Sequence, residues 1–284
     1  MLLSRPMIEP VTFGEFGECV RCSNENVEVV CTVEMGSRII SYKKLDGENV
    51  LGTCLDNVIA SEIGEYHILG GHRLWIAPEN WPVTYAPEDE AATWIVHSET
   101  SLELVQPVEK HSKTQKRILI SLGEGSEVRL EHSVTNVGAD VVTLAPWALT
   151  IMRSGGTVWI PNETFGAHGP ENLLPNRQWI TWPYTDLSDP RYEFKSDSLA
   201  VHINDNLAGP QKIGLKNGLG WCEYRLPDVT FHKSYSAVLG EYPDMGSNTE
   251  IFSAAGFVEI ETLGRLETLA PGEVAHHVEV WGLN

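Results

Sequence analysis

The run Gly256–Gly264 places two carboxylates where they could do acid/base chemistry. Successive side chains of an extended strand alternate between its faces, so Val258 and Ile260 share one face while Glu259 and Glu261 share the other. Two ionised carboxylates on one enclosed face repel each other, and this repulsion raises the pKa of one of them into the range of a general base. The alternative interpretation is a solvated outer face with two ordinary glutamates.

A polar segment just upstream of this run could belong to the same site. It contains Tyr242, Asp244 and Glu250, which we expect near a strand end beside the Glu261 strand. These polar groups favour a substrate-binding function for that face over a solvated one. Whether a divalent ion sits near Asp244 and Glu250 is left open, although we expect neither a metal site nor a cofactor.

The densest local motif is the segment Gly70–Pro82. Its paired glycines allow a close backbone approach, and an arginine beside tryptophans and prolines makes a rigid rim on which a flat apolar sugar face could stack. We therefore predict that Arg73, Trp75 and Glu79 bind substrate. The alternative is that Trp75 and Trp81 are core residues and that Arg73 pairs with one of the many carboxylates.

Basic residues elsewhere carry weaker signals. His132 alternates in phase with apolar neighbours, which favours a core histidine, and His276 and His277 point to opposite faces of one strand, which argues against a metal site made from both. Lys212 and His232 lie near aromatic residues in the sequence. Either could contact a ligand, although each residue type is more often a surface or satisfied polar group.

The elements that must position these residues are strands. Runs of five to eight alternating or β-branched residues recur between Gly, Pro, Asn and Asp clusters, and no helical periodicity lasts for ten residues. The chain shows no repeat, linker or composition shift, so we predict one all-β domain over residues 1–284, a large antiparallel β-sandwich. The irregular segment Asn162–Pro190 is expected to pack over one end of the sandwich and to line a site.

The charge and the cysteines limit the partners and the setting. The 284 residues carry a formal net charge of -19, which repels nucleic acid and anionic membranes but admits neutral sugars and cations. Five scattered cysteines make a disulfide framework improbable, and the Cys19–Cys22 spacing has no second half of a zinc site. With neither a leader-like nor a membrane-spanning run, we expect a cytoplasmic protein.

The order of these segments resembles that of the galactose mutarotase-like superfamily, the aldose 1-epimerase supersandwich. The resemblance covers most of the chain and includes an opening strand pair at residues 28–51, His72-Arg73, Ile260-Glu261-Thr262 and Leu269–Glu273. The combination of the 70–75, 145–150, 242–244 and 261–264 segments is more similar still to a bacterial branch, the DUF4380 family.

The resemblance implies roles for particular residues. His72-Arg73 stands where epimerases carry a sugar-holding Asn-Arg pair, and Glu261 stands at the catalytic glutamate of their Leu-Glu-Thr motif. Their catalytic histidine belongs to the strand that resembles Ala145–Thr150, where this chain has Trp147. The proton-donating partner must then come from elsewhere, with His72, Lys212 and His232 as candidates.

Two functions of different class follow from the resemblance. The first is an aldose 1-epimerase-like isomerase in which Glu261 and His72 transfer protons, while Trp147, Lys212 and the residues already named hold a small carbohydrate. The second is a carbohydrate-binding or sensing protein that has lost the chemistry, an interpretation favoured by Trp147 in place of histidine. A sugar-acid isomerase or lyase ranks below both, and the sequence leaves the sugar and the oligomeric state open.

Overall fold

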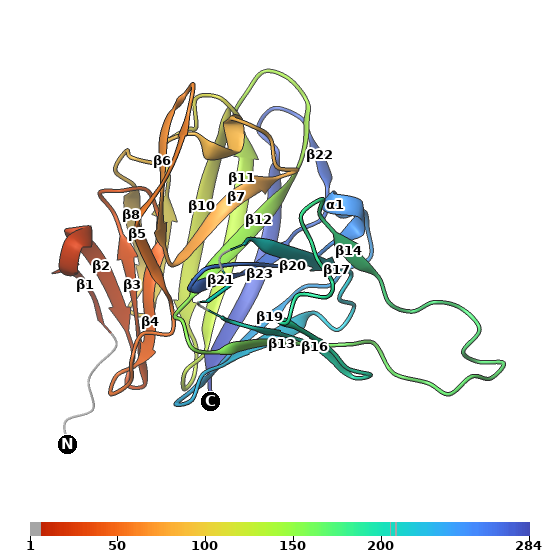
Figure 1. Cartoon of the computed structure of the whole chain (residues 1–284). Coiled ribbons are helices and arrows are strands. Elements are labelled where there is room, and N and C mark those ends of the chain that lie inside the picture. The colour runs from red at the N-terminus through yellow and green to blue at the C-terminus, as the bar shows by residue number, and fades with distance from the viewer. Residues whose placement is uncertain (1–6, 205, 208) are drawn as a thin grey trace.

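The structure, a computed structural model, describes residues 7–204, 206–207 and 209–284, which form two large antiparallel sheets packed against each other (Figure 1). The first sheet contains, in spatial order, β1 (Met7–Thr12), β2 (Glu18–Ser23), β3 (Val27–Thr32), β4 (Ile39–Lys44), β7 (His72–Ala77), β12 (Val142–Met152), β21 (Phe257–Leu263), β20 (Thr249–Ala254), β17 (Gln211–Leu215) and β14 (Trp179–Thr181), and β22 (Glu267–Leu269) pairs with β12.

The second sheet covers one face of the first. Its spatial order is β15 (Tyr192–Phe194), β16 (Ser198–His202), β13 (Thr157–Pro161), β18 (Trp221–Arg225), β19 (Thr230–Tyr235), β23 (Val274–Leu283), β11 (Val128–Asn136), β10 (Thr114–Leu122), β9 (Ser101–Val105) and β8 (Thr93–Ser98). The helical elements of the described residues are η1 (Gly14–Phe16), η2 (Val83–Tyr85) and the single turn α1 (Pro243–Gly246). The predicted all-β sandwich is confirmed.

A hydrophobic core fills the space between the sheets and sets which side chains of the strands that line it point inward. Val258 and Ile260 of β21 point into this core, as their alternation predicts, and the core extends in sequence from Val20 to Leu283. The opposite side of the first sheet, which we call its outer face, therefore receives Glu259 and Glu261. That residues 1–284 form one domain stays a prediction, and residues 1–6, 205 and 208 lie outside the described part.

The β5–β6 hairpin covers part of the outer face. It consists of β5 (Thr53–Ser61) and β6 (Gly64–Gly70), which pair with each other alone. Tyr66 of the hairpin is fully buried and packs with Trp75 and Trp147, which project from the outer face. These three aromatic residues are therefore held between the first sheet and the hairpin.

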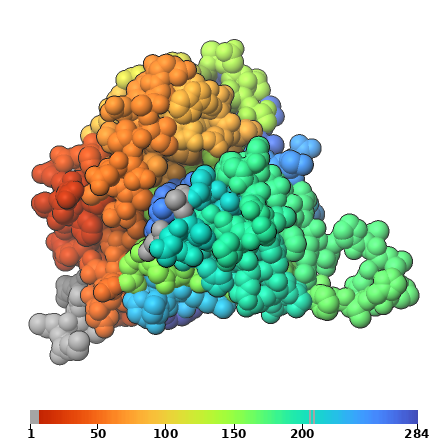
Figure 2. Space-filling view, in the orientation of Figure 1, coloured from red at the N-terminus to blue at the C-terminus, as the bar shows by residue number. Residues whose placement is uncertain are grey.

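The segment Asn162–Pro190 behaves differently in its two halves. The part before β14 projects away from both sheets (Figure 1) and forms a lobe that stands off the body (Figure 2). Leu173 and Leu174, at 68% and 85% exposed, lack the contacts that would hold this part against the sandwich. The two ends of this part do contact the body, where Glu163 accepts from the N–H of Gly218 and Gln178 donates to the carbonyl of Met245. The prediction that the whole segment packs over one end is therefore wrong for the stretch between these ends.

None of the helices in the described residues is long and apolar enough to cross a bilayer.

Candidate functional site

A row of directly paired residues crosses the outer face of the first sheet. Arg73 of β7 pairs with Leu149 of β12, Leu149 pairs with Glu261 of β21, and Glu261 pairs with Glu250 of β20. Gly214 of β17 continues the row beside Glu250. Cross-strand partners project from the same face, so the sheet brings a guanidinium and two carboxylates, widely separated in sequence, to one place.

Lys212 of β17 lies between the two carboxylates of this row. Its Nζ is 2.7 Å from Oε2 of Glu250 and 3.0 Å from Oε2 of Glu261. Glu250 is 0% exposed and Glu261 is 1% exposed, so water screens neither charge. Burial raises the pKa of both carboxyls against the opposing effect of Lys212, and that of Glu250 reaches about 8. Burial opposes the charge on Lys212, but Glu261 and Glu250 outweigh burial and raise its pKa.

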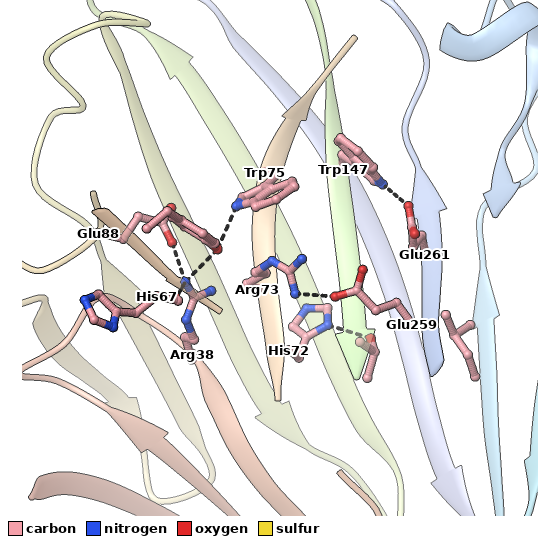
Figure 3. A network of polar contacts seen from close by, with 12 residues as sticks. Arg38, His67, His72, Arg73, Trp75, Glu88, Trp147, Glu259 and Glu261 are labelled. Carbon is pink, nitrogen blue, oxygen red and sulfur yellow. Dashed lines mark hydrogen bonds and ion pairs between the residues drawn. The ribbon is translucent and has the colours of Figure 1, made fainter. Parts of the chain in front are cut away.

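Trp147 of β12 contacts Glu261 directly. Its Nε1 donates a hydrogen bond of 2.9 Å to Oε2 of Glu261 (Figure 3), and its ring centroid lies 4.8 Å from Nζ of Lys212. An indole N–H donates a hydrogen bond but keeps its proton. Trp147 therefore stabilises the charged form of Glu261 without being able to act as an acid.

Arg73 pairs with Glu259, two residues from Glu261. Its Nη1 donates to Oε1 of Glu259 at 2.8 Å (Figure 3), and its guanidinium lies 4.4 Å from the ring centroid of Trp75. Burial opposes the charge on Arg73, but Glu259, Tyr66 and Glu261 together outweigh it and the pKa of Arg73 rises. The ion pair that the sequence offered as an alternative is present, and it lies within the site.

A second buried ion network fixes the aromatic wall of the site. Arg38 donates to the hydroxyl of Tyr66 at 2.7 Å and to Oε2 of Glu88 at 2.9 Å (Figure 3). Tyr66 in turn accepts the indole N–H of Trp75 at 2.9 Å. Burial raises the pKa of Glu88, but Lys116 and Arg38 outweigh burial and lower it below its ordinary value. The network ties the hairpin to the first sheet and orients Trp75.

The histidine predicted as a catalytic partner lies on the wrong side of the sheet. His72 precedes Arg73 in β7, and neighbouring residues of a strand point to opposite faces. It is fully buried between the two sheets, where its Nδ1 contacts Oγ1 of Thr150 at 2.8 Å and its Nε2 contacts Nε2 of His132 at 2.7 Å. The prediction that His72 transfers a proton at the Glu261 site is therefore wrong. His232, another candidate, belongs to β19 of the second sheet.

The remaining predicted residues lie at differing distances from this centre. Asp244, in the left-handed turn α1 with φ of 51°, lies near enough to Glu250 for its charge to add to the raised pKa of that carboxyl. Glu79 is exposed and accepts a hydrogen bond from the hydroxyl of Tyr85. Tyr242 is buried and its hydroxyl donates to the carbonyl of Val238, so the structure does not direct it to the carboxylates.

Sequence reasoning missed the residues that cover Lys212. The ring of Trp182, in the loop after β14, lies 4.7 Å from Nζ of Lys212. Gly214 makes room for it, since a Cβ at this glycine would come within 3.1 Å of the Trp182 ring. Tyr184 follows, and burial raises its pKa to about 12 with smaller effects from Lys212 and Glu261. The Trp- and Pro-rich composition of this loop was the available signal, but no periodicity indicated its direction.

Both carboxylates of the row are shielded from solvent. A cavity of about 300 Å³ opens beside Trp75, where Asn80, Thr84 and Lys116 also line it, but neither Glu250 nor Glu261 is among its lining residues. Both carboxylates and Lys212 are buried. A ligand that touches these carboxylates therefore requires a movement of the residues around them.

Behind the site, between the sheets, lies a network of buried polar residues. In the part of the chain that the structure describes, one group, His72, His132 and Glu279, brings three metal-ligand atoms within 4.8 Å of one another. Lys233 Nζ is 2.9 Å from Oε1 of Glu279, and Trp281 Nε1 donates to Oε2 at 2.8 Å. An ammonium beside the carboxylate repels a cation, so the group fits a satisfied hydrogen-bond network better than a metal site.

Comparisons with known proteins bear on the fold. Neither a family model nor a curated protein matches the sequence, so the resemblance to the DUF4380 family stays a prediction. A TPR-domain containing protein from Parabacteroides distasonis ATCC 8503 matches the structure with a TM-score of 0.66 and 14% identity, over 94% of this chain and 47% of that one. This chain thus spans about half the length of that protein.

Two further solved structures match over nearly their whole length. A galactose mutarotase-like protein from Lactobacillus casei ATCC 334 has a TM-score of 0.62 and 11% identity, covering 94% of this chain and 100% of that one. A proposed aldose 1-epimerase from Escherichia coli K12 has a TM-score of 0.55 and 12% identity, covering 99% of each chain. At such identities the likeness concerns the fold alone. The protein has the galactose mutarotase-like β-sandwich fold.

Proposed function

We propose that this protein is an aldose 1-epimerase-like isomerase that interconverts the anomers of a sugar or sugar derivative by acid/base catalysis. The observation that carries the proposal is the row Arg73–Leu149–Glu261–Glu250 on the outer face, walled by Trp75 and Trp147. The row combines a buried base for proton transfer with a fixed cation and aromatic surface that can hold a sugar. The proposal also agrees with the names of two proteins of similar fold, a galactose mutarotase-like protein and a proposed aldose 1-epimerase.

Glu261 is the base in this proposal. Its carboxylate accepts the proton of the anomeric hydroxyl, while an acid protonates the ring oxygen and the C1–O5 bond opens. Rotation about C1–C2 and reclosure of the ring give the other anomer. Each proton transfer of this kind contributes about 10²- to 10⁴-fold to the rate, so the two together supply a large part of an enzymatic acceleration.

Arg73 and the tryptophans hold the sugar in this proposal. Once Arg73 is paired with Glu259, its remaining N–H groups can donate to ring hydroxyls or to an acidic substituent. Trp75 and Trp147 offer apolar surface to the C–H face of a pyranose. The carbohydrate is also the proposed partner, and the -19 net charge agrees with a neutral ligand and disfavours nucleic acid.

The setting proposed for this activity is the cytoplasm. All five cysteines of the chain are free thiols. Burial raises the pKa of the Cys19, Cys22 and Cys54 thiols to about 11 or 12, so they are protonated at neutral pH and unreactive. Free thiols agree with a reducing compartment.

The test is anomer exchange measured by polarimetry or by NMR exchange spectroscopy on aldoses, uronic acids and sugar phosphates. The proposal requires that the protein accelerates exchange of at least one sugar above the spontaneous rate. Thermal-shift screening of the same panel selects the sugars to examine first, because a ligand that binds only the folded state raises its stability.

The alternative is a carbohydrate-binding protein without chemistry. The specific observation that favours it is that Trp147, which cannot exchange a proton, donates to Glu261, and Lys212 is held by both carboxylates. Calorimetry that detects sugar binding, together with spontaneous exchange rates for every bound sugar, would select this alternative.

A further inference from the structure

Three buried charged groups meet on the outer face with an unbalanced charge. Glu250, Glu261 and Lys212 are at least nine-tenths buried, and a single ammonium lies within 3.0 Å of both carboxylates. If both carboxylates were ionised, the three groups together would carry one net negative charge. Burial of an uncompensated charge costs several kcal/mol, and a buried group commonly takes up a proton instead.

The hydrogen bonds indicate which carboxylate takes the proton. Glu261 faces two donors, the Lys212 ammonium at 3.0 Å and the Trp147 indole N–H at 2.9 Å. Glu250 faces one donor, the same ammonium at 2.7 Å from its Oε2, and its oxygens have no further partner among the described residues. Donors to the charged form favour ionisation. The charge therefore resides on Glu261 and the proton on Glu250.

The other groups around the pair reinforce this assignment. Asp244, from the turn α1, adds a negative charge near Glu250 and favours its protonated form. On the other side, Glu259 disfavours the charge on Glu261 while Arg73 favours it. Tyr184 lies close enough for the charges of both carboxylates to add to the burial that raises its own pKa. The raised pKa of Glu250, about 8, agrees with the geometry.

We propose that Glu250 and Glu261 share one proton at neutral pH, and that protonated Glu250 is the general acid which replaces the missing histidine. The catalytic part of this inference rests on the proposed function. The Glu250 carboxylic acid gives its proton to the ring oxygen as Glu261 takes the proton of the anomeric hydroxyl. The C1–O5 bond breaks and a carbonyl forms at C1.

Ring closure returns both protons, so the cycle consumes nothing. O5 attacks the carbonyl carbon and gives its proton back to Glu250, while Glu261 protonates O1. Lys212 keeps its proton throughout, because the two carboxylates raise its pKa, and it balances whichever carboxylate is charged. Two carboxyl groups whose environments separate their proton affinities can in this way act as acid and base on one face.

The shared proton is tested without any substrate. Protein labelled with ¹³C at the glutamate carboxyls is titrated by NMR from pH 5 to pH 10. We expect one buried carboxyl to titrate near pH 8, to disappear in Glu250→Gln, and to titrate at lower pH in Glu261→Gln, where the neighbouring negative charge is gone. The matched control Glu131→Gln, at a partly exposed site on β11, leaves the titration near pH 8 unchanged.

The wild-type titration alone can overturn the inference. If every glutamate carboxyl of the wild-type protein titrates below pH 6, no proton is shared, whatever the variants do. If the high-pH resonance disappears in Glu261→Gln instead of Glu250→Gln, the proton resides on the other carboxyl and Glu250 is not the acid. Glutamine has the shape of a protonated glutamate, so we expect both variants to fold.

Kinetics separate the inference from the proposed function. On a sugar that the wild-type protein turns over, kcat/KM falls as the pH rises through about 8, and Glu250→Gln loses about 10²- to 10⁴-fold because an amide cannot give up its proton. If NMR finds the carboxyl that titrates near pH 8 but no sugar is turned over, the proposed function fails and the shared proton stands. If Glu250→Gln remains fully active, the inference fails and the proposed function stands.

Discussion

Lys233 carries a prediction that can be worked out from its surroundings. Its ammonium is completely buried between the sheets, 2.9 Å from Oε1 of Glu279 and 2.6 Å from Oγ1 of Thr150. Lys233→Met keeps the apolar stem but leaves the Glu279 carboxylate with only neutral donors, Thr262 and Trp281. Removing one partner of a buried ion pair costs about 3–5 kcal/mol, a large share of the roughly 5–15 kcal/mol by which domains are stable.

The loss depends on pH in a definite direction. In the wild-type protein burial raises the pKa of Glu279, but Lys233 together with His72, His132 and His277 outweighs burial and holds it below its unfolded value. The pair therefore stabilises the fold above a pH of about 4.3, the ordinary pKa of a glutamate, and the stabilisation is lost as the pH falls toward the folded pKa. In Lys233→Met the pKa of Glu279 rises instead, so the difference between the two proteins is largest at neutral pH and shrinks in acid.

The measurement is urea unfolding followed by tryptophan fluorescence, at pH 7 and at pH 5.5. The double variant Lys233→Met/Glu279→Gln removes the buried charge as well, and we expect it to recover at least about half of the loss. A single variant that loses less than about 1 kcal/mol at pH 7, the size of an exposed pair, would refute the reasoning. So would a double variant as unstable as the single one, because the loss would then not come from the uncompensated carboxylate.

Three further predictions concern the site and the core. Glu261→Gln reduces anomer exchange by about 10²- to 10⁴-fold in polarimetry with an unchanged circular dichroism spectrum, because an amide cannot accept the anomeric proton. Trp147→Phe removes one donor to the Glu261 carboxylate and raises its pKa, so the acid limb of the kcat/KM profile moves to higher pH. Burial lowers the pKa of His72, His132 and His277, that of His277 to about 3, so unfolding measurements show a loss of about 4 kcal/mol per pH unit as the pH falls below about 6.5.

Each of these predictions has an outcome that would contradict it, and two have a matched control variant. Full activity of Glu261→Gln on every sugar that the wild type accepts removes Glu261 from the mechanism. The control Trp81→Phe changes an indole that is 56% exposed, and we expect it to leave the pH profile unchanged. If Trp147→Phe gives the same profile as Trp81→Phe, the hydrogen bond to Glu261 does not affect the pKa of that carboxyl. His111→Gln, at an exposed imidazole, leaves the acid dependence unchanged, and stability that does not fall between pH 6 and pH 5 contradicts neutral core histidines.

Much of the first sheet's pattern could be predicted from the sequence. The alternation around Glu261 predicts which side chains enter the core and which leave it, because a strand has a period of two residues. The same rule applied to His132 predicts a core histidine, and the structure places it there. Applied to His72, it would have placed that residue opposite Arg73. The resemblance to epimerases instead suggested that His72 and Arg73 act at the same site, and this prediction is wrong for His72.

Local sequence patterns determined that this is an all-β chain, the face that each strand residue occupies, and the position of Glu261 on the side away from the core. Only the tertiary structure decided which strands are neighbours. The order β7–β12–β21–β20–β17 joins Arg73, Glu261 and Lys212 across nearly 190 residues of sequence. Strand order depends on the packing of the whole sandwich, which no local window contains. Burial depends on it too, and burial is the largest cause of the raised pKa of Glu250.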